Sequence, residues 1–269
     1  MLDQPHHPAL ARPLAAFHAR TPPRIWSLII TFLGDAILPR GGLVRAGVIS
    51  DFCSLADVEA GLVRTALSRL VAKGFVQRSR EGRASFYRLT EAERRDFGSA
   101  ADLIYGRRLP QPDGGWDLAL LDTLDGSTAL RTRIASLRYR AIAANVYMRP
   151  HHREDAAFGE PELTILDARP RSDIGPLAAR LWPVAEIAAS YDLFVRNFDG
   201  IATARLDSAE SILARILLVH EFRRVLLRDP FLPVEALPAP WPGSAARRLF
   251  DTAHAALTPM AEAWLDAHG

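Results

Sequence analysis

Basic and hydroxyl side chains are concentrated between residues 61 and 95, in a pattern that suits contact with nucleic acid. This segment holds nine basic and three acidic residues and therefore a net charge of +6, whereas the 269-residue chain has a formal net charge of only +2. Guanidinium groups form bidentate hydrogen bonds with phosphates, and guanidinium and hydroxyl groups also hydrogen-bond the edges of bases. A basic patch on a nearly neutral chain is typical of phosphate binding, although basic helix faces also serve solubility. We therefore expect this segment to bind double-stranded DNA.

Two elements must position these side chains: a helix that ends at a glycine and a hairpin that follows it. Leu62, Ala66 and Leu70 have the spacing of a helix face turned toward a core, and Gly74 ends the helix. Residues 76–90 then read as two short strands. This layout is typical of a winged helix-turn-helix, which places a helix in the major groove and a hairpin beside the phosphates. The residues expected to contact DNA are Arg64, Thr65, Ser68, Arg69, Lys73, Arg78, Arg80, Arg83 and Ser85.

The rest of the chain divides by composition and periodicity. Residues 1–23 contain five prolines and are expected to be a flexible arm that precedes the winged helix-turn-helix of residues 24–108. Residues 109–115, rich in Pro and Gly, then predict a linker. Residues 116–182 alternate strand, helix, strand, strand and helix, with residues 142–148 as the second strand, which is typical of the first part of a ferredoxin-like domain. Residues 183–269 have helical periodicity throughout, so we predict an α+β chain with a helical C-terminal domain.

Other reactive side chains form no recognisable catalytic or metal site, and we expect neither an enzyme nor a cofactor. Cys53 is the only cysteine, which excludes an intrachain disulfide, and its apolar surroundings favour an inert buried thiol. His151 and His152 are adjacent, so on an extended chain they point to opposite sides, which favours a solvated loop over a metal site. Whether that loop binds metal is left open.

One enzymatic alternative is a metal-dependent nucleic-acid hydrolase. Asp122 follows the first strand of the central domain, a place similar to that of an aspartate in the ferredoxin-like nucleases of CRISPR adaptation. A single carboxylate is a poor two-metal site, so a turn-capping role is favoured. We also expect a cytoplasmic protein with no membrane segment, because the apolar run at residues 26–33 is too short to span a bilayer and prolines interrupt the N-terminus.

Several motifs are more specific than the general pattern. They are the segments 39–42 (PRGG), 63–70 (VRTALSRL), 82–90 (GRASFYRLT), 222–233 (FRRVLLRDPFLP) and 241–243 (WPG). Together they resemble the PaaX-like repressors of phenylacetic-acid degradation, and the resemblance extends from about Arg24 to Ala263. It implies a homodimeric transcriptional repressor that leaves its operator when an aryl-coenzyme A thioester such as phenylacetyl-coenzyme A binds.

The effector itself stays open at this stage. PaaX-like regulators also serve other aromatic pathways, and the loop at residues 151–155 is distinctive, so a free aromatic acid is the alternative. Trp and Tyr can stack on an aryl or adenine ring, and Arg can pair with phosphates, although each such residue could equally be core or part of an ion pair. An effector site between the central and C-terminal domains is expected to draw on Arg131, Trp182, Tyr191, Arg223, Arg228 and Trp241.

Overall fold

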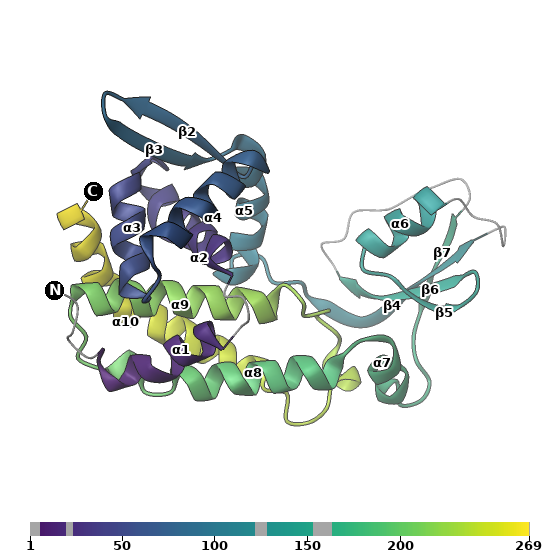
Figure 1. Ribbon diagram of the computed structural model, residues 1–269. Coiled ribbons are helices and arrows are strands. Elements are labelled where there is room, and N and C mark those ends of the chain that lie inside the picture. Colours follow the sequence, from purple (N-terminus) through teal and green to yellow (C-terminus); the bar gives the residue numbers. More distant parts are fainter. Residues whose placement is uncertain (1–5, 20–23, 122–127, 153–162, 269) are drawn as a thin grey trace. The chain divides into compact units, whose positions relative to one another are not determined.

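The computed structural model describes residues 6–19, 24–121, 128–152 and 163–268, and it separates into two compact units (Figure 1). The first unit comprises residues 1–107, 191–227 and 243–269, and the second comprises residues 108–190 and 228–242. Helices dominate the first unit, and an antiparallel sheet forms the centre of the second. The mixture of helices and antiparallel sheets agrees with the α+β class. No helix of the described residues combines the length and the apolar character that crossing a membrane requires.

The N-terminal segment contains a helix, α1 (Pro8–His18), instead of the flexible arm expected from its prolines. Leu10, Leu14 and Phe17 are buried, and their spacing of four and three residues makes one apolar helix face. Pro8 is tolerated because the first position of a helix needs no backbone donor. Burial of the apolar face against α9 (Ser208–Leu226) therefore outweighs the helix-breaking composition.

Helix α2 (Ile25–Phe32) runs on without interruption into a π-helical turn, η1 (Leu33–Ile37), and a 3-10 turn, η2 (Leu38–Arg40). The π-helical turn lies against α5 (Glu91–Ile104), and Gly34 permits that approach. A Cβ atom at Gly34 would stand 1.9 Å from Cε2 of Phe97, so no larger residue fits without movement of the ring.

Two helices joined by a short turn and a hairpin follow this segment. They are β1 (Val44–Arg45), α3 (Ala46–Leu55), α4 (Ala60–Ala72), β2 (Val76–Glu81) and β3 (Ala84–Leu89). The strands form an antiparallel sheet in the order β1-β3-β2. The buried row of α4 consists of Val63, Ala66, Leu67 and Leu70. The expectation that Leu62 also faces the core is wrong, because the row at i, i+3, i+4 and i+7 begins one residue later and leaves Leu62 50% exposed.

The C-terminal helices α9 and α10 (Gly243–His268) belong to the same compact unit as the N-terminal helices. Helix α9 is buried almost all round, because it contacts α1, α2, α3, α5 and α10 (Figure 1). Its residues therefore build the core of the unit that contains α4 and the hairpin. This arrangement differs from the separate helical domain that periodicity alone suggests for residues 183–269.

The second unit is a four-stranded antiparallel sheet in the order β5-β6-β4-β7. Its elements are β4 (Pro112–Leu121), α6 (Thr128–Ser136), β5 (Arg140–Ala143), β6 (Val146–His152), β7 (Leu163–Ala168) and α7 (Gly175–Leu181). Helix α8 (Val184–Phe198) follows and continues into the first unit. Residues 142–148, expected to be one strand, instead span the turn between β5 and β6. Strand β4 also begins at Pro112, inside the stretch expected to be a linker.

Side chains of β4 alternate between the two faces of this sheet and so enter two cores. Trp116 and Leu118 pack in a cluster with Trp182, whereas Ala119 and Leu121 pack in a second cluster with residues of α6. The sheet of the second unit is therefore covered on both faces.

Candidate nucleic-acid interface

The exposed surface of α4 carries four of the residues expected to contact DNA. Thr65 and Ser68 lie opposite the buried row, in line with Gly61, whereas Arg64 and Arg69 lie on the two sides of this line. Small side chains therefore occupy the most protruding part of the helix, and guanidinium groups border it. The hydroxyl of Thr65 donates a hydrogen bond of 3.0 Å to the carbonyl of Gly61, which leaves its lone pairs on the exposed side.

The hairpin carries a second group of the expected residues. Cross-strand pairing places Arg80 opposite Ser85 and Arg78 opposite Tyr87, and directly opposite residues of an antiparallel pair lie on one face. Arg78 donates to the hydroxyl oxygen of Ser85 from Nη2 at 2.8 Å and from Nε at 3.3 Å. Ser85 therefore orients the guanidinium of Arg78 on the face that also carries Arg80.

The hairpin tip and the end of α4 hold the remaining two expected contacts. Arg83 follows Gly82, whose φ of 59° lies in the left-handed region that glycine adopts without strain. Lys73 is the exposed residue that ends α4. All nine expected residues thus lie on α4 and the hairpin, and eight of them are exposed.

Sequence reasoning missed one further exposed basic residue of the three-stranded sheet. Arg45 lies in β1 and pairs with Phe86 of β3, so its exposed side chain lies on the face of the sheet that carries Ser79 and Phe86, opposite to the face of Arg78 and Arg80. It stands outside the basic segment of residues 61–95, and only the sheet pairing brings it there. No carboxylate of the described residues forms an ion pair with Arg45, Arg64, Arg69, Lys73, Arg78, Arg80 or Arg83. Their charges are therefore available to an external anion.

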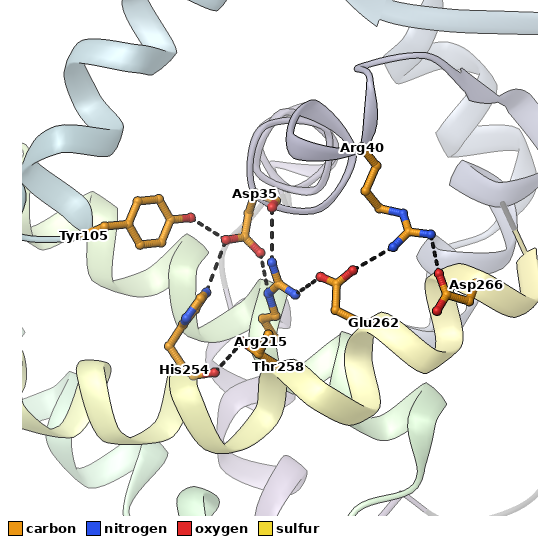
Figure 2. A network of polar contacts seen from close by, with 8 residues as sticks. All are labelled: Asp35, Arg40, Tyr105, Arg215, His254, Thr258, Glu262 and Asp266. Carbon is orange, nitrogen blue, oxygen red and sulfur yellow. Dashed lines mark hydrogen bonds and ion pairs between the residues drawn. The ribbon is translucent and has the colours of Figure 1, made fainter.

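A buried polar network holds the segment that leads into β1 (Figure 2). Asp35 of the π-helical turn accepts hydrogen bonds from Tyr105 and from Nε of Arg215, the latter at 2.8 Å, and His254 lies 3.4 Å from it. Burial alone would raise the pKa of Asp35, but the hydrogen bond of His254 and the charge of Arg215 hold it below its ordinary value. Burial and the neighbouring carboxylate raise the pKa of the Tyr105 hydroxyl.

The network extends to the surface through α10. Arg215 also donates to Glu262 at 2.7 Å, and Glu262 accepts from Arg40 at 2.8 Å. Arg40 pairs with Asp266 as well. Both ends of the segment 35–40 are thus tied to the C-terminal helices. Residues 41–43 lead from it directly into β1 and the sheet of the hairpin.

The residues expected to bind an effector are not gathered at one place within either unit. Trp182 is buried beside Trp116, with ring centroids 5.7 Å apart, and Trp241 packs on the same core cluster. Arg131 donates to the hydroxyl of Tyr147 at 2.7 Å, next to the other core cluster. Arg228 lies 3.7 Å from a carboxylate oxygen of Glu186 in an exposed pair.

The two other expected effector residues belong to the first unit. Tyr191 is buried there, and Arg223 donates from Nη2 to the hydroxyl of Ser27 at 2.7 Å and to its carbonyl at 3.2 Å. Burial lowers the pKa of Arg223, and the charge of Arg224 adds to this effect. Trp182 and Tyr191 are buried in the core, and Arg131, Arg223 and Arg228 each have a polar partner within their own unit.

The histidines considered as metal ligands have other partners. Nδ1 of His151 lies 3.2 Å from Asp113, and Nε2 of His152 lies 3.1 Å from the carbonyl of Phe231. Within the described ranges, no group of three or more His, Cys, Asp or Glu residues is arranged to hold a metal ion. Cys53 is buried, and burial raises the pKa of its thiol to about 12, which agrees with an inert side chain. Asp122 and residues 153–155 lie outside the described residues.

Comparison with known proteins defines the class of this chain. Residues 24–93 match the family model described as PaaX-like protein, and residues 182–267 match the PaaX-like protein C-terminal domain. The chain is 30% identical over 263 residues to the transcriptional repressor PaaX of Escherichia coli (strain K12), which covers 90% of this chain and 83% of that protein. The chain therefore belongs to the PaaX-like family, a family of regulators, and the expectation that it is not an enzyme is confirmed.

A solved structure is similar in fold. The uncharacterized protein Rv0674 from Mycobacterium tuberculosis matches with a TM-score of 0.53 and 24% sequence identity, covering 81% of this chain and 90% of that one. At this identity the likeness concerns the fold alone.

Proposed function

We propose that this protein is a transcriptional repressor that binds operator DNA through a winged helix-turn-helix made of α3, α4 and the β2–β3 hairpin. The observation that carries the proposal is the exposed surface of α4. It presents Thr65 and Ser68 between Arg64 and Arg69, and no described carboxylate neutralises these arginines. A helix of this kind fits the major groove, where hydroxyl and guanidinium groups hydrogen-bond base edges.

The hairpin supplies the contacts that position the helix. Arg78, Arg80 and Arg83 are exposed on one short ribbon, and contacts from such residues to phosphates add affinity without reading sequence. Each phosphate contact should steepen the salt dependence of binding, because it releases a counterion from the duplex.

The proposal is tested with the full-length protein and duplexes selected by that protein from a random library. We expect a selected duplex to bind at least about a thousandfold more tightly than an unrelated duplex at the same salt concentration. Enrichment of no sequence, together with equal binding of all duplexes, would contradict the proposal. Cleavage of the DNA in the presence of divalent cations would favour the hydrolase alternative instead.

We further propose that the repressor acts as a homodimer in the cytoplasm, on an operator with two inverted half-sites. One helix in one major groove reads too few base pairs to mark a site in a genome, so two copies are needed. Multi-angle light scattering should give about twice the chain mass of 29.6 kDa at micromolar concentration. A mass of one chain, both free and on DNA, would overturn this part.

The second unit is proposed to be a ferredoxin-like effector domain. Its strand order β7-β4-β6-β5 with antiparallel neighbours is the order of a split βαβ fold, which supports this assignment. An aryl-coenzyme A thioester is the proposed effector of a PaaX-like repressor, and a free aromatic acid is the alternative. Arg131 and Arg228 are the charged members of the expected effector residues in this unit; Arg131 is partly exposed, and Arg228 forms an exposed pair with Glu186.

Fluorescence anisotropy of the protein on its selected duplex distinguishes the two effector classes. Phenylacetyl-coenzyme A should release the labelled duplex, with a coupling of about 1–3 kcal/mol between effector and DNA. Release by phenylacetic acid but not by the thioester would favour the alternative. Release by neither would remove the effector proposal and leave DNA binding intact.

A further inference from the structure

Leu62 is a large apolar residue on the otherwise polar, exposed surface of α4. Its side chain is 50% exposed, and it lies in the first turn of the helix. Helical spacing places it in one row with Thr65 and Arg69, at i, i+3 and i+7. Half of a leucine is thus left in water at the N-terminal end of a row that continues with a hydroxyl and a guanidinium, although the buried row of the same helix starts at the next residue.

An apolar side chain at this place can read a chemical group that its neighbours cannot. Arg and Thr recognise hydrogen-bond donors and acceptors, whereas the 5-methyl group of thymine projects into the major groove and offers only an apolar surface. We propose that Leu62 contacts the methyl group of a thymine and thereby selects that base in each operator half-site. This inference rests on the proposed function, because it assumes that the exposed surface of α4 lies in the major groove.

The position of Leu62 along the helix supports this role. In a helix-turn-helix, the N-terminal residues of the second helix reach the base edges. Gly61 adds no side chain beside Leu62, and a Cβ built there would have only Nη2 of Arg64 within 4 Å, at 3.9 Å. The first turn of α4 therefore offers Leu62 without a bulky neighbour in front of it.

Val71 provides a matched control on the same helix. It is also exposed, at 38%, but nine residues separate it from Leu62. Nine residues correspond to half a rotation about the helix and about 14 Å along it, so Val71 lies in the last turn on the opposite side. An apolar residue at that place should not reach the same base.

The experiment uses the full-length protein and a duplex that it selects from a random library. Each thymine of the duplex is replaced in turn by deoxyuridine, which lacks only the 5-methyl group, and binding is measured by fluorescence anisotropy. For the unmodified chain we expect the replacement to weaken binding about fourfold at one thymine in each half-site, the effect of one lost methyl contact. For Leu62→Ala the same replacement should change binding by less than half as much, whereas Val71→Ala should retain the full loss.

The outcomes separate this inference from the proposed function. If no duplex is selected, DNA recognition itself fails. If a duplex is selected but deoxyuridine is tolerated at every position, or if Leu62→Ala loses as much as the unmodified chain, the thymine contact is refuted while DNA binding stands. Because Leu62 is half exposed, Leu62→Ala should melt within a few degrees of the unmodified chain. Should Leu62→Ala unfold, Leu62→Met, which keeps an apolar side chain, is measured instead and must retain the fourfold loss of affinity on deoxyuridine replacement. If deoxyuridine replacement left the affinity of Leu62→Met unchanged, the contact would also be refuted.

Discussion

Arg215 of α9 and Asp35 of the π-helical turn form a buried ion pair, with Nε and Oδ2 2.8 Å apart and side chains 6% and 1% exposed. The pair joins the core helix of the first unit to the segment that leads into β1. Because Tyr105, His254 and Glu262 complete the hydrogen bonds of both partners, the charges are satisfied in a dry environment (Figure 2). A break in this pair should therefore affect the unit that carries the proposed DNA-binding surface.

Removal of one partner of this pair is expected to be strongly destabilising. Arg215→Met leaves the carboxylate of Asp35 buried without its cation, which should cost about 3–5 kcal/mol of unfolding free energy. Urea denaturation followed by circular dichroism measures this loss. Asp266→Asn provides the comparison, because its exposed pair with Arg40 should contribute at most about 1 kcal/mol. Equal losses in the two variants would contradict a special role for the buried pair.

Acid should remove the contribution of Asp35. The pKa of this carboxyl is below its ordinary value of 3.8 in the folded chain, so the ionised form is the stabilising one. Its contribution is fully present above the unfolded pKa and is lost as the pH falls below about 4 through the lower folded pKa. We expect the difference in unfolding free energy between the unmodified chain and Asp35→Asn to shrink as the pH falls below about 4. A difference that grows on acidification would contradict the sign of this shift.

Gly34 should not tolerate a methyl group. In Gly34→Ala the new Cβ would overlap the ring of Phe97, and such overpacking costs about 1–3 kcal/mol. Gly98 is the control because it lies next to Phe97 on α5 but has no atom within 4 Å of a built Cβ. Gly98→Ala should raise the unfolding free energy by roughly 0.5–1 kcal/mol through helix propensity. Thermal melts of both variants should therefore shift in opposite directions, and a shared direction would argue against the close packing of Gly34.

The α4 and hairpin arginines should differ in what their loss does to DNA binding. Arg64→Ala combined with Arg69→Ala should weaken binding to the selected duplex by about 1–3 kcal/mol per base contact and relax its sequence preference. Arg80→Ala should weaken binding to every duplex alike and reduce the slope of log K against log salt by about 0.9. Anisotropy titrations at several salt concentrations measure both effects. Unchanged affinity in the double variant would remove α4 from the interface.

Ser85→Ala tests whether a hydroxyl on the hairpin acts through its neighbour. Loss of the two hydrogen bonds to Ser85 frees the guanidinium of Arg78, so affinity should fall by less than in Arg78→Ala. In the Arg78→Ala background, Ser85→Ala should then have little further effect on binding. If Ser85→Ala lowered the affinity for DNA as much in the Arg78→Ala background as in the unmodified chain, Ser85 would contact DNA by itself.

Local patterns in the sequence were enough to predict the elements that carry the proposed DNA contacts. The helical spacing and terminal glycine of α4 and the two short strands that follow it depend on neighbours within a few residues. Exposure of Arg64, Thr65, Ser68 and Arg69 follows from the same helical period. Family motifs in the sequence likewise identified the PaaX-like class.

What the tertiary structure decided depends on residues that are distant in the chain. The partners Asp35 and Arg215 are 180 positions apart, and no local pattern brings them together. The prolines near the N-terminus suggested an arm, but burial of Leu14 and its neighbours against α9 makes a helix. Trp182 and Tyr191 were expected at an effector site, and the packing of distant elements buries both side chains. Leu62 was assigned to the core because an apolar row that begins at Leu62 and one that begins at Val63 fit the local sequence almost equally well. Side-chain burial depends on which other elements pack against a helix, so only the folded chain distinguishes a core leucine from one that faces solvent or DNA.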